Sequence, residues 1–147
     1  GKKVLELINY HKPDFYTELH CYNLKNYVKL TSMERYKKTG IPPLIKLGNH
    51  VLVSSVSPLI RMTYFSTETV CKTLEFPCFE KLNPQIIDEY GFNKDLAIET
   101  YEELLNLILS SSSRKHFENE MLKKYKSQVY TAMEYAQKVF GKDFPPY

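Results

Sequence analysis

Residues 40–65, GIPPLIKLGNHVLVSSVSPLIRMTYF, are the one stretch of this chain whose composition favours β-structure. Short apolar runs rich in Val, Ile and Leu follow one another there, separated by Gly-Asn at 48–49 and Ser-Pro at 57–58. Apolar runs that alternate and are joined by turn residues are typical of antiparallel strands. We therefore expect a small antiparallel β-meander over about residues 44–65. A buried helical segment is the alternative for any one of these runs, because short apolar runs fit both structures.

The segments on either side of this stretch have the spacing of amphipathic helices, with apolar residues three or four positions apart. Asn83 and Asn93 each precede such a pattern and are expected helix N-caps. The main helices are expected at about residues 4–11, 14–30, 94–109 and 114–140, of which the last is the longest.

Residues 66–76, STETVCKTLEF, fit two structures. Ser66 or Thr67 is suited to capping a helix, whereas Val70 and Thr73 are β-branched and favour a strand. We expect a helix here and keep the strand as the alternative.

Together these patterns predict an α+β fold, a mainly helical domain with a small antiparallel β-meander (about residues 44–65) and a long C-terminal helix. The 147 residues are enough for one compact domain with its own core. We expect residues 1–147 to form a single globular domain, and a chain that begins with Gly1 instead of Met indicates a domain of a larger protein. The expected core residues include Leu5, Ile8, Leu19, Leu24, Val51, Val53, Ile60, Met62, Leu96, Leu104, Ile108, Phe117, Met121, Val129 and Met133.

The net charge of +3 is small, but the charged residues are unevenly distributed. Residues 1–40 hold eight Lys or Arg against four Asp or Glu, and residues 111–147 hold seven against four. Residues 81–110 hold two against six, and residues 41–80 are balanced at three each. An acidic segment between basic ones is most often a set of solvated faces, but it also offers complementary patches to a partner.

The sequence contains few of the patterns typical of enzymes. It has no C-x-x-C, H-x-x-x-H or H-E-x-x-H spacing, no Gly-rich phosphate loop and no G-x-S-x-G. We therefore expect no catalytic residues, no metal site and no cofactor. An enzyme whose catalytic groups meet only in the folded chain is the alternative.

The three cysteines, Cys21, Cys71 and Cys78, are widely spaced and odd in number. This argues against a disulfide framework and favours an intracellular protein of the nucleus or cytoplasm. We expect the cysteines to be buried as small apolar residues. The chain also lacks any run of 18 or more apolar residues, so no membrane span and no membrane partner is expected.

The C-terminal helix is a candidate nucleic-acid surface, because its lysines alternate with tyrosines. Lysines neutralise phosphates, and exposed aromatic rings stack on unpaired bases. Glutamates on the same helix reduce its charge. The candidate partner-binding residues are Lys115, Lys123, Lys124, Lys126, Tyr130, Tyr135 and Lys138.

The function we expect first is non-catalytic protein–protein interaction, as a scaffold or assembly domain of a larger intracellular regulatory protein. The chain has 12 tyrosines, a residue type enriched at interfaces. A sheet of few strands also has edges that accept an extended peptide, unless a helix or loop covers them. The expected partner is therefore another protein, docked to a surface patch or a sheet edge, with nucleic-acid binding as the alternative.

Overall fold

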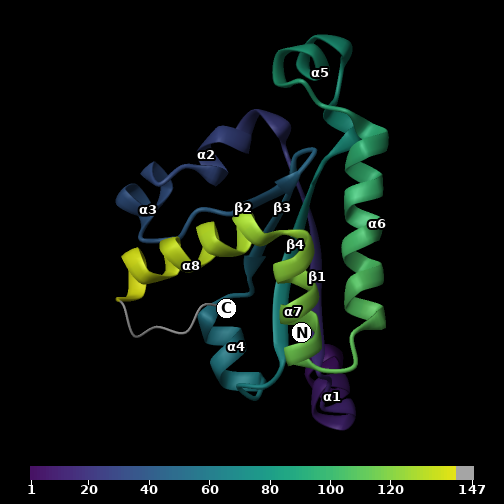
Figure 1. The fold of residues 1–147 in the computed structure, drawn as a ribbon, viewed down its shortest axis with the longest axis vertical. Coiled ribbons are helices and arrows are strands. Elements are labelled where there is room, and N and C mark those ends of the chain that lie inside the picture. The colour runs from purple at the N-terminus through teal and green to yellow at the C-terminus, as the bar shows by residue number, and fades with distance from the viewer. Residues whose placement is uncertain (142–147) are drawn as a thin grey trace.

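The computed structural model describes residues 1–141, apart from the side chains of Pro58 and Lys81, and is built around one mixed sheet (Figure 1). The strands are β1 (Phe15–Tyr22), β2 (Ile45–Gly48), β3 (Val51–Ser55) and β4 (Val70–Pro77). The helices are α1 (Lys2–His11), α2 (Tyr27–Thr31), α3 (Glu34–Thr39), α4 (Pro58–Tyr64), α5 (Pro84–Tyr90), α6 (Lys94–Ser110), α7 (Arg114–Lys124) and α8 (Lys126–Phe140). Two 3₁₀ turns, η1 (Leu24–Asn26) and η2 (Phe79–Lys81), complete the described elements. The α+β fold with a C-terminal helix is confirmed.

The four strands lie in the order β1-β4-β3-β2. β2 and β3 form the expected antiparallel hairpin, and its turn residues Asn49 and His50 both have positive φ, at 46° and 65°. Positive φ at both central residues matches the right-handed twist of the paired strands. The Tyr22 hydroxyl donates a hydrogen bond of 2.6 Å to the His50 carbonyl, so the turn is held against the end of β1.

β1 is a strand, so the helix expected from about residue 14 was wrong over Phe15–Tyr22. β1 pairs in parallel with β4 over eight residues, from Phe15 opposite Val70 to Tyr22 opposite Pro77. Parallel strands must be joined by a long crossover, here one that contains the hairpin and α4. The partner of β1 is therefore far away in sequence, where a local periodicity does not reveal it.

Two further expectations around the meander were wrong. Residues 59–65 lie mainly in α4 instead of a third strand, because Pro58 begins a helix after Ser57. Met62 of this helix is 83% exposed. From Val70 onward the segment 66–76 is strand β4, the alternative that the β-branched Val70 and Thr73 favour. β4 is a central strand, and five of its eight residues are buried.

The C-terminal helices α6, α7 and α8 cover one face of the sheet (Figure 1). On that face the ring of Phe15 meets Phe117 of α7 edge-on at 5.7 Å, and Phe76 of β4 meets Tyr101 of α6 at 5.1 Å. Burial of these apolar side chains supplies most of the free energy that stabilises the fold. The largest fully buried side chains are Leu24, Leu52, Leu74, Leu104, Val51, Val56 and Pro77.

The expected helix over 114–140 is interrupted at Tyr125, whose φ of −124° and ψ of 41° are not helical. The Tyr125 side chain is buried, and its hydroxyl bonds to Glu103 of α6. The chain turns at this residue, so α7 runs in the same direction as β1 and β4 in the view of Figure 1, whereas α8 runs toward α3. Helix periodicity continues through the break and therefore did not predict it.

The expected core was only partly right. Ile8, Leu24, Val51, Leu104 and Phe117 are buried as expected. The predictions for three others were wrong, because exposed fractions are high for Leu19 at 57%, Met62 at 83% and Leu96 at 45%. Leu19 and Met62 are exposed because the element that contains each of them is not the one expected from the sequence.

Candidate functional site: the edge of β1 and the α7–α8 elbow

β1 is the outer strand on one side of the sheet, and β2 is the outer strand on the other. α8 packs against β2, whereas the C-terminal half of β1 is exposed at Leu19, His20 and Cys21. Among residues 1–141, β4 is the only strand paired with β1. Outer strands of this kind present backbone groups that another strand can bind. We call the free side of Phe15–Tyr22 the β1 edge.

The pairing pattern tells which backbone groups point outward at the β1 edge. The Val70 amide donates to the Asp14 carbonyl, and the Cys78 amide donates to the Tyr22 carbonyl, each over 2.8 Å. In a parallel ladder, residues of the same parity bond to the same neighbour. Even-numbered residues of β1 therefore face β4, and the odd-numbered residues direct their amides and carbonyls away from it. These are Phe15, Thr17, Leu19 and Cys21.

A polar cluster lies beside this edge, on the sheet face opposite Phe15. The Tyr16 hydroxyl donates to Glu18 Oε1 over 3.0 Å, and burial, followed by this hydrogen bond, raises the pKa of Tyr16. His20 lies between two carboxylates, with Nε2 3.5 Å from Glu18 and Nδ1 3.4 Å from Glu75. The His20 side chain is 50% exposed, so it also reaches the solvent beside the β1 edge.

The second candidate surface is a shallow depression where α7 and α8 meet. Ser113 caps α7 by accepting from the His116 amide, and His116 Nδ1 accepts in turn from the Ser112 amide over 3.2 Å. These hydrogen bonds hold the first turn of α7 and the His116 side chain in position. The residues that line the depression, which we call the α7–α8 elbow, are His116, Asn119, Glu120, Leu122, Lys123, Lys126 and Tyr130.

Most lysines of the two helices have carboxylate partners. Lys123 Nζ lies 2.5 Å from Glu120, which lowers the pKa of that carboxyl, and Lys138 lies 2.6 Å from Glu134. Lys124 pairs with Glu103 of α6. These pairs are exposed, so each contributes little to stability, but they neutralise much of the positive charge.

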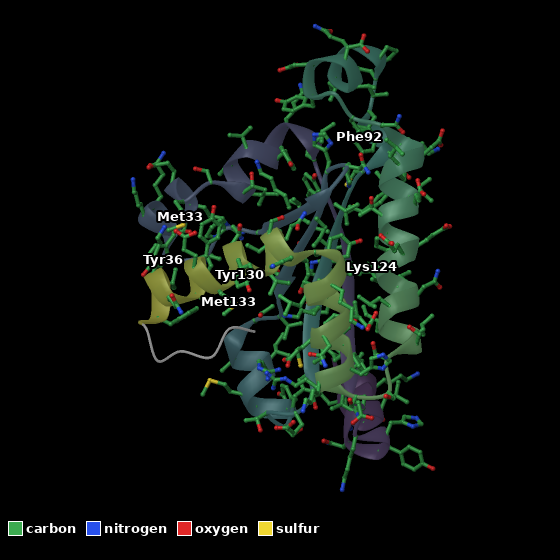
Figure 2. The ribbon with its side chains drawn as sticks, viewed as in Figure 1. Met33, Tyr36, Phe92, Lys124, Tyr130 and Met133 are labelled. Carbon is green, nitrogen blue, oxygen red and sulfur yellow. The ribbon has the colours of Figure 1, made fainter. Side chains whose placement is uncertain are left out.

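The structure brings together only part of the predicted partner-binding set. Lys123, Lys126 and Tyr130 meet at the α7–α8 elbow, and Tyr130 is 51% exposed. Figure 2 shows Lys124 on the side of α7 that faces α6, and there it lines an acidic depression with Glu99, Glu102 and Glu103. The other three residues lie apart from the elbow, exposed at Lys115 and Lys138 and half-buried at Tyr135.

The residues of the β1 edge were not identified as a site from the sequence, because a helix was expected there. Read as a strand, the alternation of Tyr16, Glu18 and His20 with Thr17 and Leu19 would have indicated two different faces. At the elbow, His116 and Asn119 were also missed, although they lie at helical spacing from Lys123. That helical spacing was the signal in the sequence that could have identified these two residues.

Within residues 1–141, no group of three or more His, Cys, Asp or Glu is arranged to hold a metal ion. In the same part of the chain, no helix has both the length and the apolar character needed to cross a membrane.

Comparison with known proteins identifies uncharacterized relatives. One is an uncharacterized protein of Methanocaldococcus jannaschii (MJ0501), 46% identical over 80 residues. The match covers 54% of this chain and spans 38% of the relative's length. No solved structure matches the chain. A family model, described as an uncharacterized protein conserved in archaea (DUF2119), matches residues 1–141, and the chain therefore belongs to that family.

Proposed function

We propose that this chain is a non-catalytic protein-interaction domain that assembles by adding a strand to the β1 edge, inside the cell. The observation that supports this most directly is the exposed C-terminal half of an outer strand eight residues long. Strand addition uses the backbone for affinity and alternate side chains for specificity. Leu19, 57% exposed, is the apolar side chain best placed for that contact.

The strand that best fits this edge is β1 of a second copy. Outward-facing residues must pair with outward-facing residues, which restricts an antiparallel pair to a few registers. With Leu19 opposite Leu19 of the other copy, Glu18 lies opposite His20 and His20 opposite Glu18. Opposed apolar and complementary polar pairs stabilise neighbouring strands by about 0.2–1 kcal/mol each. If residue 18 or residue 20 lay opposite itself in place of Leu19, Glu18 would face Glu18 or His20 would face His20.

The test is sedimentation equilibrium of the 147-residue chain over a range of concentrations. We expect a concentration-dependent dimer that Leu19→Lys weakens at least tenfold, because charge at an edge opposes pairing. Leu109→Lys is the matched control, since Leu109 is 82% exposed on α6 and is not part of the β1 edge. A wild-type chain that stays monomeric, or a dimer insensitive to Leu19→Lys, contradicts the proposal.

The register has its own test in a pair of exchanged side chains. Glu18→His and His20→Glu each set two like side chains opposite each other, and both are expected to weaken the dimer. The double variant E18H/H20E restores opposite partners and is expected to recover much of the lost affinity. Circular dichroism of each variant checks that the chain has folded. If the double variant lost as much binding free energy as the two single variants together, this register would be ruled out.

Nucleic-acid binding is the second candidate, supported by the α7–α8 elbow, where Lys123, Lys126 and exposed Tyr130 come together. Fluorescence anisotropy with a labelled single-stranded oligonucleotide tests it. If the elbow binds phosphates, Lys126→Glu weakens binding and flattens its dependence on salt, whereas Lys138→Glu outside the elbow has a smaller effect. An absence of binding by the wild-type chain at low salt contradicts this candidate.

A further inference from the structure

Two of the three cysteines meet at the C-terminal ends of β1 and β4, although 57 residues separate them in sequence. The Sγ atoms of Cys21 and Cys78 are 2.6 Å apart. No disulfide joins them in this structure, and Cys21 is exposed whereas Cys78 is half-buried. The expectation that the cysteines are simply buried small residues therefore fails for this pair.

The backbone brings the two thiols together. Cys21 lies opposite Phe76 in the parallel ladder, and the Cys78 amide donates to the Tyr22 carbonyl over 2.8 Å. Each cysteine is thus next to a strand–strand hydrogen bond, and neither needs a loop to move before the sulfur atoms meet. A disulfide requires this kind of backbone proximity, because its Cβ atoms lie only about 3.5–4.5 Å apart.

We propose that Cys21 and Cys78 are a modification site, at which they form a reversible disulfide by exchange with the disulfide of a small thiol compound. The Cys21 thiolate attacks one sulfur of that disulfide, its S–S bond breaks, and one thiolate leaves. The Cys78 thiolate then attacks Cys21 Sγ and displaces the second thiolate. The two protein thiols lose two protons and two electrons, and the small disulfide gains them as two thiol molecules.

The order of attack follows from exposure. Cys21 is open to solvent at the β1 edge, so it meets the small disulfide first, and Cys78 lies beside it to resolve the mixed disulfide. Cys71 takes no part, since it is 3% exposed and burial raises the pKa of its thiol. A thiol of raised pKa has less thiolate and reacts more slowly.

The bond would join the end of β1, which leads into η1, to the end of β4, which leads into η2. It would close a loop that contains α2, α3, the β2–β3 hairpin and α4. This inference does not depend on the proposed interaction at the β1 edge, because it concerns two side chains of one chain.

The experiment treats the reduced wild-type chain with excess oxidised glutathione, quenches with acid and measures intact mass and free thiols. We expect loss of two of the three thiols with no added glutathione, and a non-reducing peptide map that joins Cys21 to Cys78. Dithiothreitol should return all three thiols. Wild-type protein that keeps three thiols, or accumulates a stable glutathione adduct, overturns the proposal.

Single substitutions separate the roles of the thiols. In Cys78→Ser the adduct on Cys21 has no resolving thiol, so one bound glutathione is expected to persist. Cys71→Ser is the matched control and should form the disulfide as the wild type does. Both variants keep the small side chain at the substituted position, and circular dichroism checks their folding. Persistence of the adduct on Cys21 in Cys71→Ser, where Cys78 is present, would also overturn the proposal.

Discussion

The Tyr125 hydroxyl donates a hydrogen bond to Glu103 Oε2 over 2.8 Å, so the residue that separates α7 from α8 is joined to the middle of α6. Burial raises the pKa of Tyr125, and the hydrogen bond to Glu103 raises it further, so the hydroxyl stays protonated as a donor. Lys124 binds the other oxygen of the same carboxylate. Two adjacent residues therefore bind one acceptor from both sides.

The first prediction concerns this hydrogen bond. Tyr125→Phe keeps the buried ring but removes the donor, and should lower the free energy of unfolding by about 1 kcal/mol. Tyr130→Phe removes a hydroxyl from a 51% exposed side chain and should change it by much less. Urea denaturation compares the two variants with the wild type. Equal effects in both would contradict a stabilising role for the Tyr125–Glu103 bond.

A second prediction follows from Glu103 itself. The hydrogen bond from Lys124, followed by that from Tyr125, holds the pKa of this carboxyl below its ordinary value of 4.5. Stability from Glu103 is therefore fully present above the unfolded pKa and is lost as the pH falls through the lower folded pKa. In Glu103→Gln the acid-induced loss of stability should be smaller than in the wild type. Urea denaturation at a series of acidic pH values measures the difference.

Lys72 predicts a further rise of stability with pH, in the alkaline range. Burial, followed by repulsion from Arg61, lowers the pKa of this half-buried lysine from 10.5 to about 8. Between these two values the unfolded chain binds more protons than the folded chain, so stability should rise as the pH increases from about 8 to 10.5. The charged or titratable groups that act on Lys72 are Arg61, Glu118, Arg114 and Cys71.

Lys72→Met is the variant that tests this dependence, because it keeps the length of the side chain and removes the titrating amine. Its free energy of unfolding should rise less between pH 8 and 10.5 than that of the wild type. Under reducing conditions the tyrosines and cysteines titrate in the same way in both proteins. Their effect on the free energy of unfolding therefore cancels when the two pH profiles are compared. Parallel pH profiles would show that Lys72 keeps an ordinary pKa in the folded chain.

The core makes a prediction of larger size. Leu104 of α6 is 1% exposed, and Leu104→Ala should lower the free energy of unfolding by about 2–5 kcal/mol through lost burial and a cavity. Leu109→Ala, on the same helix but 82% exposed, should cost well under half of that. Thermal and urea unfolding measure both. Similar losses would mean that α6 does not face the core through Leu104.

The start of α6 offers a matched pair of variants at one position. The Asn93 side chain accepts a hydrogen bond of 3.0 Å from the Leu96 amide and thereby caps the helix. Asn93→Ala should cost about 1 kcal/mol, whereas Asn93→Asp keeps an acceptor and favours the positive end of the helix dipole. Urea denaturation of the two variants checks the difference. An Asp variant as unstable as the Ala variant would contradict the capping role.

Features determined by neighbouring residues were predictable from the sequence. Asn83 and Asn93 were expected N-caps, and both side chains accept from the amide three residues later. The hairpin turn was expected from Gly48-Asn49, and the turn residues with positive φ are Asn49 and His50. In each case the interacting groups lie within one turn of chain, so spacing and residue type are sufficient.

The sheet beyond the hairpin was not predictable in this way. β1 and β4 were both expected to be helical, although Thr17, Val70 and Thr73 are β-branched. Their structure is decided by pairing with each other across a crossover, and a single sequence does not show which distant segments meet. The choice between helix and strand was correctly left open at 66–76 and for the apolar runs of 44–65, one of which lies in helix α4.

The candidate sites depend on the same distant contacts. Once β1 is a strand, Leu19 and Cys21 lie on one face while His20 lies on the other. The proximity of Cys21 and Cys78 requires the β1–β4 register, and the elbow requires the turn of the chain at Tyr125. Lys123 and Lys126 were identified from charge alone, because charge is visible in a sequence whether or not the fold is known.

The parallel pairing of β1 with β4 also matters while the chain is being made. Residues 15–22 emerge from the ribosome well before their neighbours at 70–77, so the growing polypeptide contains β1 without β4 for about 55 residues of synthesis. The hairpin has its partners close at hand and is able to form during that time. The sheet is therefore completed at β1 only after β4 has been synthesised. Until then Leu19 and its neighbours are accessible to chaperones.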